Sequence, residues 1–113
     1  MHTRIPAHLE VSGLIRAVEA AGGFASVLHK GEPDAGTILV VLCERGANAR
    51  LFERMPSLDG ARNWSLAKVQ DAENPHEFNE SLTNRTRRDP DLWIVELDIA
   101  NGERFIPIVN NAT

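Results

Sequence analysis

Apolar residues recur with helical spacing in one stretch near the start of the chain. Four of them fall at positions i, i+3, i+4 and i+7, along one stripe of an α-helix: Val11, Leu14, Ile15 and Val18. The dipeptide Gly22-Gly23 that follows can end a helix in the left-handed conformation at little cost. The pattern predicts a helix from Ala7 to Ala21 that packs one face on a sheet.

A turn-forming segment runs directly into an uninterrupted apolar strand pattern. Within Gly31–Gly36, Pro33 suits the second position of a turn and Gly36 can take a positive φ. We expect this turn to join Phe24–Lys30 and Thr37–Glu44 as an antiparallel hairpin. The residues that point to either face of the second strand are apolar, so we expect this strand to lie in the middle of the sheet, covered on both faces.

Weaker alternation predicts two more strands, Ala49–Met55 and Asn63–Val69. A second helix should start at Asn74-Pro75, because Asn can accept hydrogen bonds from the first turn, Pro fits that turn, and Glu77 completes a capping box. This helix should end near Arg88. Only two of its residues offer strong apolar contacts: Phe78 and Leu82.

The last third of the chain reads as a strand and a hairpin. Leu92–Ile99 alternates, with Trp93, Val95, Leu97 and Ile99 on one face. Asn101-Gly102 is the favoured dipeptide of a two-residue hairpin turn, so Arg104–Val109 is expected to return as a final strand. Pro107 would place that strand at an edge of the sheet.

Together these elements predict an α+β fold for residues 1–113 as a single domain, with residues 1–6 flexible. The expected order is α-β-β-β-β-α-β-β, giving a mostly antiparallel sheet of five or six strands with two helices. A chain of 113 residues suffices for one hydrophobic core.

The composition of the chain limits where the protein is expected in the cell and which classes of partner it is expected to bind. The net charge of −4 provides no overall attraction to nucleic acid or to acidic membranes. No apolar run approaches the roughly 18 residues of a membrane span, and the N-terminal segment lacks the apolar core of a signal peptide. We therefore expect a cytoplasmic protein that binds neither membrane nor nucleic acid.

Residues that could carry catalysis or bind metal are sparse. Cys43 is the only cysteine, which excludes an intramolecular disulfide, and its apolar neighbours predict an inert thiol. No two histidines have the i, i+4 spacing of a helical zinc site, and no nucleophile motif or phosphate-binding loop is present. The sequence thus predicts no catalytic residue, no cofactor and no metal, and it favours a protein that is not an enzyme.

Two groups of charged residues are candidate binding sites. Asp89, Asp91, Glu96 and Asp98 could supply oxygen ligands to Mg²⁺ or Ca²⁺, but strand rise separates Asp91 from Asp98 by roughly 20 Å. Turn hydrogen bonds and a solvated strand face explain these carboxylates better. The arginines of the segment 85–88 could contact phosphate if they shared one continuous face, whereas ion pairs with nearby carboxylates are the simpler interpretation.

Two motifs resemble those of a known family. They are Gly22-Gly23-Phe24-Ala25-x-Val27, followed by Gly31-x-Pro33-Asp34-Ala35-Gly36, and the segment Asp89-Pro90-Asp91-Leu92-Trp93-Ile94-Val95-Glu96. In this order they are similar to those of small bacterial proteins grouped only as a domain of unknown function. The resemblance implies a compact cytosolic domain, and it defines no catalytic residue.

Two functional hypotheses follow. The first is a non-catalytic domain that acts through protein contacts with an unknown partner and forms a homodimer, because the central strand needs cover that the second helix scarcely provides. The second is a small enzyme or ligand-binding protein with a site between Gly31–Gly36 and Asp89–Trp93. The candidate ligand-binding residues of that site are Asp34, Asp89, Asp91, Trp93 and His29.

Overall fold

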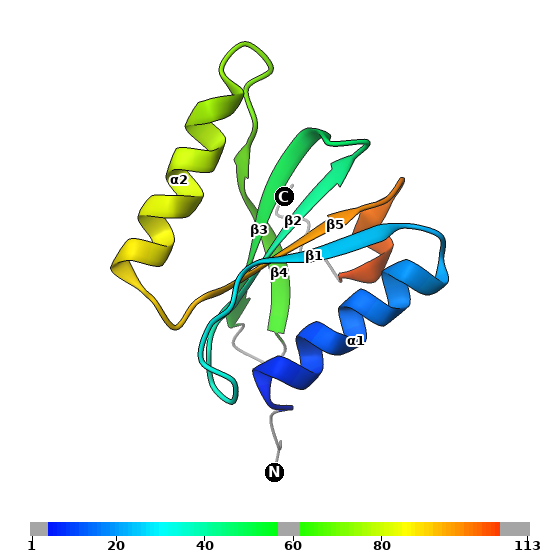
Figure 1. The fold of residues 1–113 in the computed structure, drawn as a ribbon, viewed down its shortest axis with the longest axis vertical. Coiled ribbons are helices and arrows are strands. Elements are labelled where there is room, and N and C mark those ends of the chain that lie inside the picture. Colours follow the sequence, from blue (N-terminus) through cyan, green and yellow to red (C-terminus); the bar gives the residue numbers. More distant parts are fainter. Residues whose placement is uncertain (1–4, 57–61, 107–113) are drawn as a thin grey trace.

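The computed structural model describes residues 5–56 and 62–106 and shows a three-layer arrangement (Figure 1). A five-stranded sheet lies between helix α1 (Ala7–Ala20) and helix α2 (Pro75–Arg88), which cover opposite faces. The α+β class, the two helices and the order of the elements through the fifth strand are confirmed.

The five strands lie close to predicted ones, and a short 3₁₀ helix follows them. They are β1 (Phe24–His29), β2 (Ile38–Glu44), β3 (Ala47–Pro56), β4 (Arg62–Val69), β5 (Trp93–Asp98) and a short 3₁₀ helix, η1 (Gly102–Phe105).

The sheet order is β1-β5-β2-β3-β4, so the predicted hairpin of β1 and β2 is wrong. Strand β5 lies between them, antiparallel to β1 and parallel to β2, with Val95 paired to Val27 on one side and to Val40 on the other (Figure 1). The cause lies in β5 itself, since its residues contribute to the cores on both faces and are most stable at an interior position.

Strand β2 is buried on both faces, as predicted. Each residue from Ile38 to Cys43 is at most 4% exposed. The face toward α1 packs Val11, Val18, Val40, Phe52, Trp64 and Trp93. The face toward α2 packs Leu39, Val41, Leu51, Phe78, Leu82 and Ile94.

Helix α1 begins and ends through main-chain contacts. The amides of Ala7 and His8 donate to the carbonyls of Asp34 and Pro33 at 3.0 and 2.8 Å, which satisfies two of the donors that a helix start leaves free. At the other end Gly22 has a φ of 91°, the left-handed conformation expected there.

The predicted capping box of α2 does not form. The Asn74 side chain makes no capping hydrogen bond, and the Glu77 carboxylate instead pairs with Lys68 of β4 at 2.7 Å. That ion pair ties the first turn of α2 to the edge of the sheet. Phe78 and Leu82 are the buried residues of the helix, as expected.

The predicted turn at Asn101-Gly102 is also wrong. A two-residue type I′ turn requires positive φ at both positions, and only Asn101 has it, with a φ of 55°. Gly102 lies against Leu42, and the chain continues into η1, so Arg104 and Phe105 are helical rather than extended. The rest of the predicted strand, from Pro107, lies outside the described residues. Arg45 and Gly46, with φ of 52° and 74°, form the tight turn between β2 and β3.

Neither helix of the described segments combines the length and apolar character that crossing a bilayer requires.

Truncating Phe78 tests how firmly α2 is held. The ring is 1% exposed, and removing a buried ring typically costs about 3–5 kcal/mol, so Phe78→Ala should lower the free energy of unfolding by about 3 kcal/mol in urea denaturation. His76→Ala, on the exposed surface of the same helix, should change it by less than about 0.5 kcal/mol. A loss below about 1 kcal/mol for Phe78→Ala would show that α2 contributes little to the core.

Candidate functional site

The turn Gly31–Gly36 and the segment Asp89–Trp93 meet in space, as the ligand-binding hypothesis requires. The Glu32 amide donates to the Asp91 carbonyl at 2.9 Å. The indole Nε1 of Trp93 donates to the Glu32 carbonyl at 2.7 Å. Two motifs that lie far apart in the sequence therefore dock on one another through hydrogen bonds to the main chain.

Glycine is required on the turn side of this contact. A Cβ atom at Gly31 would lie 2.1 Å from the Asp91 carbonyl oxygen, and one at Gly36 would lie 2.4 Å from the same atom. The turn itself is held by the Glu32 carboxylate, which accepts hydrogen bonds from the amides of Asp34 and Ala35 at 3.0 and 2.5 Å. Gly31, Gly36 and the Glu32 between them thus have structural explanations.

The candidate residues His29, Asp91 and Trp93 gather at this junction. The Nδ1 of His29 lies 2.6 Å from the Leu92 carbonyl, which makes it the donor, and Trp93 is buried. The main-chain carbonyl of Asp34 faces α1 instead. Main-chain contacts occupy the junction, and the fifth candidate, Asp89, borders a groove beside it.

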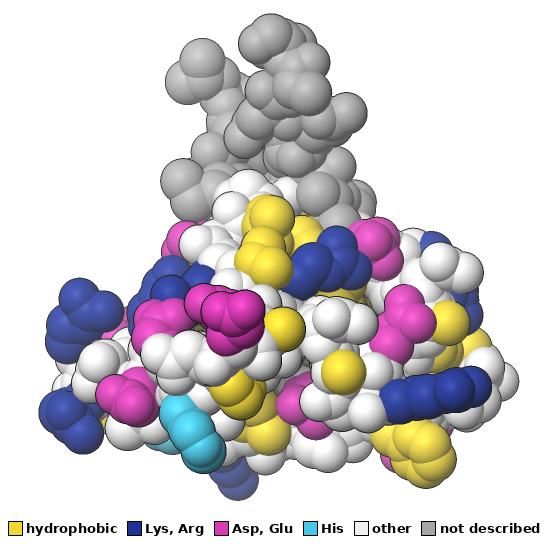
Figure 2. All heavy atoms as spheres, turned by 90° about the horizontal axis from the view of Figure 1, so that it is seen from above, with side chains coloured by type: hydrophobic (Ala, Val, Ile, Leu, Met, Phe, Trp, Pro, Cys, Tyr) yellow, Lys and Arg dark blue, Asp and Glu magenta, His cyan; other side chains and the backbone are white. Residues whose placement is uncertain are grey.

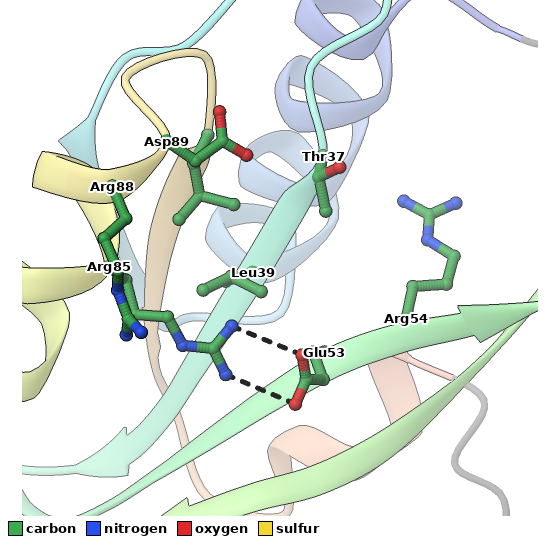
Figure 3. A pocket seen from close by; sticks show the side chains of 8 residues that line it. Thr37, Leu39, Glu53, Arg54, Arg85, Arg88 and Asp89 are labelled. Carbon is green, nitrogen blue, oxygen red and sulfur yellow. Dashed lines mark hydrogen bonds and ion pairs between the residues drawn. The ribbon is translucent and has the colours of Figure 1, made fainter.

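This groove has a volume of about 520 Å³ and lies between the C-terminal end of α2 and strands β2 and β3 (Figure 3). Its floor is apolar and its rim is charged. The lining residues are Thr37, Leu39, Glu53, Arg54, Arg85, Arg88, Asp89 and Leu92. Of the five predicted site residues, only Asp89 lines it. Arg85 and Arg88 belong to the arginine cluster of segment 85–88, but no sequence pattern connects that cluster with Glu53 or Arg54, because these residues come from separate elements that only the tertiary fold brings together.

The three arginines that line the groove differ in whether they form an ion pair. Arg85 crosses from α2 to β3 and donates to both carboxylate oxygens of Glu53, at 3.2 and 3.3 Å (Figure 3). The guanidinium of Arg54 points away from that pair, stacks over Trp64 and bonds Glu10 at 2.5 Å. Arg88 makes only a 3.4 Å contact from Nε to the Asn84 carbonyl among the described residues. Two basic groups, Arg85 and Arg88, thus face two carboxylates, Glu53 and Asp89.

The acidic residues of β5 have local structural contacts. Asp98 accepts hydrogen bonds from the amides of Arg45 and Gly46 at 2.7 and 3.0 Å, which ties β5 to the β2–β3 turn. Burial and then the charge of Asp98 raise the pKa of Glu96. Across the described ranges, no three metal-binding side chains converge on one point.

Cys43 lies in the same neighbourhood and is buried. Burial first, and the charges of Glu96 and Asp98 next, raise the pKa of its thiol to about 12. The thiol is therefore protonated at neutral pH, which fits the prediction of an unreactive cysteine.

Comparisons with known proteins place the chain beside a family described only as a protein of unknown function, DUF1491, whose sequence profile matches residues 5–107. A crystal structure and an NMR structure of a DUF1491 family protein from Caulobacter crescentus CB15 share 32% and 31% identity with this chain. They have TM-scores of 0.77 and 0.78, and cover 94% and 96% of this chain and all of their own. The solution structure of a protein from A. tumefaciens shares 29% identity, with a TM-score of 0.77, over 98% of this chain and 99% of its own. No curated protein matches.

Adding a methyl group at Gly31 should break the junction. The clash is with main-chain atoms, which cannot rotate away, so Gly31→Ala should lower the free energy of unfolding by at least about 2 kcal/mol. Gly13→Ala is the matched control, since open space surrounds that helical position. It should stabilise by about 0.5–1 kcal/mol. Equal effects of the two substitutions in thermal and urea unfolding would contradict the proposed docking.

The raised pKa of Glu96 predicts a pH-dependent effect on stability. The folded protein holds this proton more tightly than the unfolded chain, so a destabilising contribution develops as the pH rises through the unfolded value and above it. Glu96→Gln should therefore raise the unfolding midpoint at pH 7, and the gain should vanish near about pH 3, where both states are protonated. Glu19→Gln, exposed on α1, should show no such trend. An unchanged or lowered midpoint at pH 7 would contradict the prediction.

Proposed function

Since the chain belongs to the DUF1491 family, which is described only as of unknown function, we propose that it is a non-catalytic cytoplasmic domain that acts through protein contacts and forms a homodimer. The observation that carries the proposal is the free edge of β1. Among the described residues this strand pairs with β5 on one side only.

The apolar surface lies elsewhere than the sequence suggested. The sequence pointed to a bare face of the central strand, or to an edge near Pro107. Strand β2 is covered on both faces, and Pro107 lies outside the described residues. Three large apolar side chains are instead exposed on β1: Phe24 at 76%, Leu28 at 47% and Val27 at 42%.

Strand β1 lacks the usual protection of an edge. It contains no Lys, Arg, Asp, Glu or Pro, whereas the opposite edge, β4, carries Arg62 and Lys68. Charged side chains and prolines are the common means by which native edge strands avoid pairing with other chains. The irregularity between Val27 and His29 leaves Phe24–Val27 regularly paired to β5, and no strand of the described ranges pairs with the other side of this stretch.

A second copy of the chain is the partner that fits this edge. Antiparallel pairing about a two-fold axis would place the Phe24 end of each strand beside the His29 end of the other, extending the sheet to ten strands. An uncharged strand brings no like charges together, although the whole chain carries −4. Lys30, next to His29, would come near the Phe24 end, where Phe24 pairs with Asp98.

The charge pattern of the face shown in Figure 2 fits nucleic acid poorly. On the face shown in Figure 2, basic and acidic side chains are interspersed and do not gather by sign. Arg85 is neutralised by Glu53, and Arg87 contacts Asn84 on the same helix. This arrangement supports protein contacts over binding to phosphates.

The homodimer is tested by light scattering coupled to size-exclusion chromatography. The native chain should elute at twice its own mass at concentrations of tens of micromolar. Leu28→Lys should shift it to a monomer, because a charge on the free edge opposes strand pairing.

Leu66→Lys is the control, since Leu66 is a similarly exposed leucine, at 51%, on the other edge strand. This variant should remain a dimer. A native chain that stays monomeric at high concentration, or a loss of the dimer with Leu66→Lys alone, would refute association through β1.

A further inference from the structure

We infer that the groove between α2 and the sheet binds a small organic carboxylate, through Arg88 and the outer donors of Arg85. This goes beyond self-association, because the groove and the β1 edge involve different elements. The argument rests on the size of the groove, its apolar floor, its available donors and its balance of charge.

The volume and floor suit a small molecule with an apolar body. About 520 Å³ falls within the roughly 300–1,000 Å³ of typical ligand sites. Leu39 and Leu92 form the base, and both belong to the core on this side of the sheet. Thr37 contributes a hydroxyl at the end of the groove next to Asp89 (Figure 3).

The side of the groove formed by α2 has more N–H hydrogen-bond donors than its own contacts use. Each guanidinium has five N–H groups. Arg85 uses two nitrogens for Glu53, while Arg88 uses only Nε, in a long contact of 3.4 Å to the Asn84 carbonyl one turn earlier in the helix. Arg85 and Arg88 are three residues apart on α2, so they project from neighbouring positions on one side of the helix. Planar forks of this kind match the two oxygens of a carboxylate.

The acidic groups of the rim decide which anion fits. Glu53 and Asp89 offset the charges of Arg85 and Arg88, and the third arginine of the lining, Arg54, is paired with Glu10. No net positive charge remains to stabilise a phosphate dianion. A carboxylate carries one charge and can be held by Arg88, which has no acidic partner in the described part of the chain. Its apolar body would then lie over Leu39 and Leu92.

Arg87 supplies a matched control. It lines the opposite, outward side of α2 together with His76, Asn79, Glu80, Thr83 and Asn84. Replacing Arg87 by Gln removes the same charge from the same turn of the helix without altering the groove. The comparison of Arg88→Gln with Arg87→Gln therefore separates a specific contact from the general loss of positive charge.

The experiment is a titration of the ¹⁵N-labelled full chain with hexanoate, followed by amide chemical shifts. Hexanoate should move the amides of Thr37, Leu39 and Leu92 in a saturable manner, whereas neutral hexanol should move them far less. Arg88→Gln should weaken binding roughly tenfold, the usual size of one lost charge-assisted contact, while Arg87→Gln leaves it unchanged. Repeating the titration with Leu28→Lys should give the same affinity, which makes the result independent of the dimer.

Three results would overturn the assignment. They are the absence of saturable shifts at millimolar hexanoate, equal shifts with hexanol, and equal weakening by Arg87→Gln. A titration with inorganic phosphate completes the test, because tighter binding of phosphate than of hexanoate would also contradict a carboxylate site.

Discussion

The fold depends on the close contact between the Gly31–Gly36 turn and the main chain of Asp91. The turn passes so near Asp91 that no side chain fits at two of its positions, and Glu32 and Trp93 complete the contact by hydrogen bonds. The same turn offers the carbonyls of Pro33 and Asp34 to the start of α1. One short segment therefore connects the first helix, the crossover to β2 and the entry to β5.

This contact explains why motifs from the two ends of the chain occur together. The segment from Lys30 to Thr37 carries the chain past the start of β5, so that β1 and β2 come to lie on opposite sides of that strand. The Trp93 amide donates to the Thr37 carbonyl at 2.8 Å, which begins the parallel pairing of β2 with β5. The residues that looked like a ligand site in the sequence are thus largely those that hold the centre of the sheet together.

The local sequence pattern was sufficient to predict the helices and strands, but it was insufficient to predict which strands pair in the sheet. The spacing of apolar residues directly reflects which side chains are buried. It therefore predicted the apolar stripe of α1, the apolar run of β2 and the two buried residues of α2. Strand β1 could pair with either β2 or β5, and the choice depends on which pairing is more stable in the whole fold. The turn residues between β1 and β2 suggested β2, because they reflect local structure only. The groove was not predictable for a related reason: Arg85 belongs to a recognisable arginine cluster, but Glu53 lies 32 residues away from it in a strand without a motif. Asp89 was found because it closes a recognisable turn.

The interior position of β5 has a consequence for how the protein is made. During synthesis, β1 and β2 leave the ribosome long before residues 93–98, so neither can complete its pairing until β5 has been made. Until then the apolar faces of β2 and the edge of β1 lack their native cover, and such nascent segments are prone to aggregate. The position of β5 late in the chain and in the interior of the sheet thus delays closure of the sheet until after every other strand of the described sheet has been made.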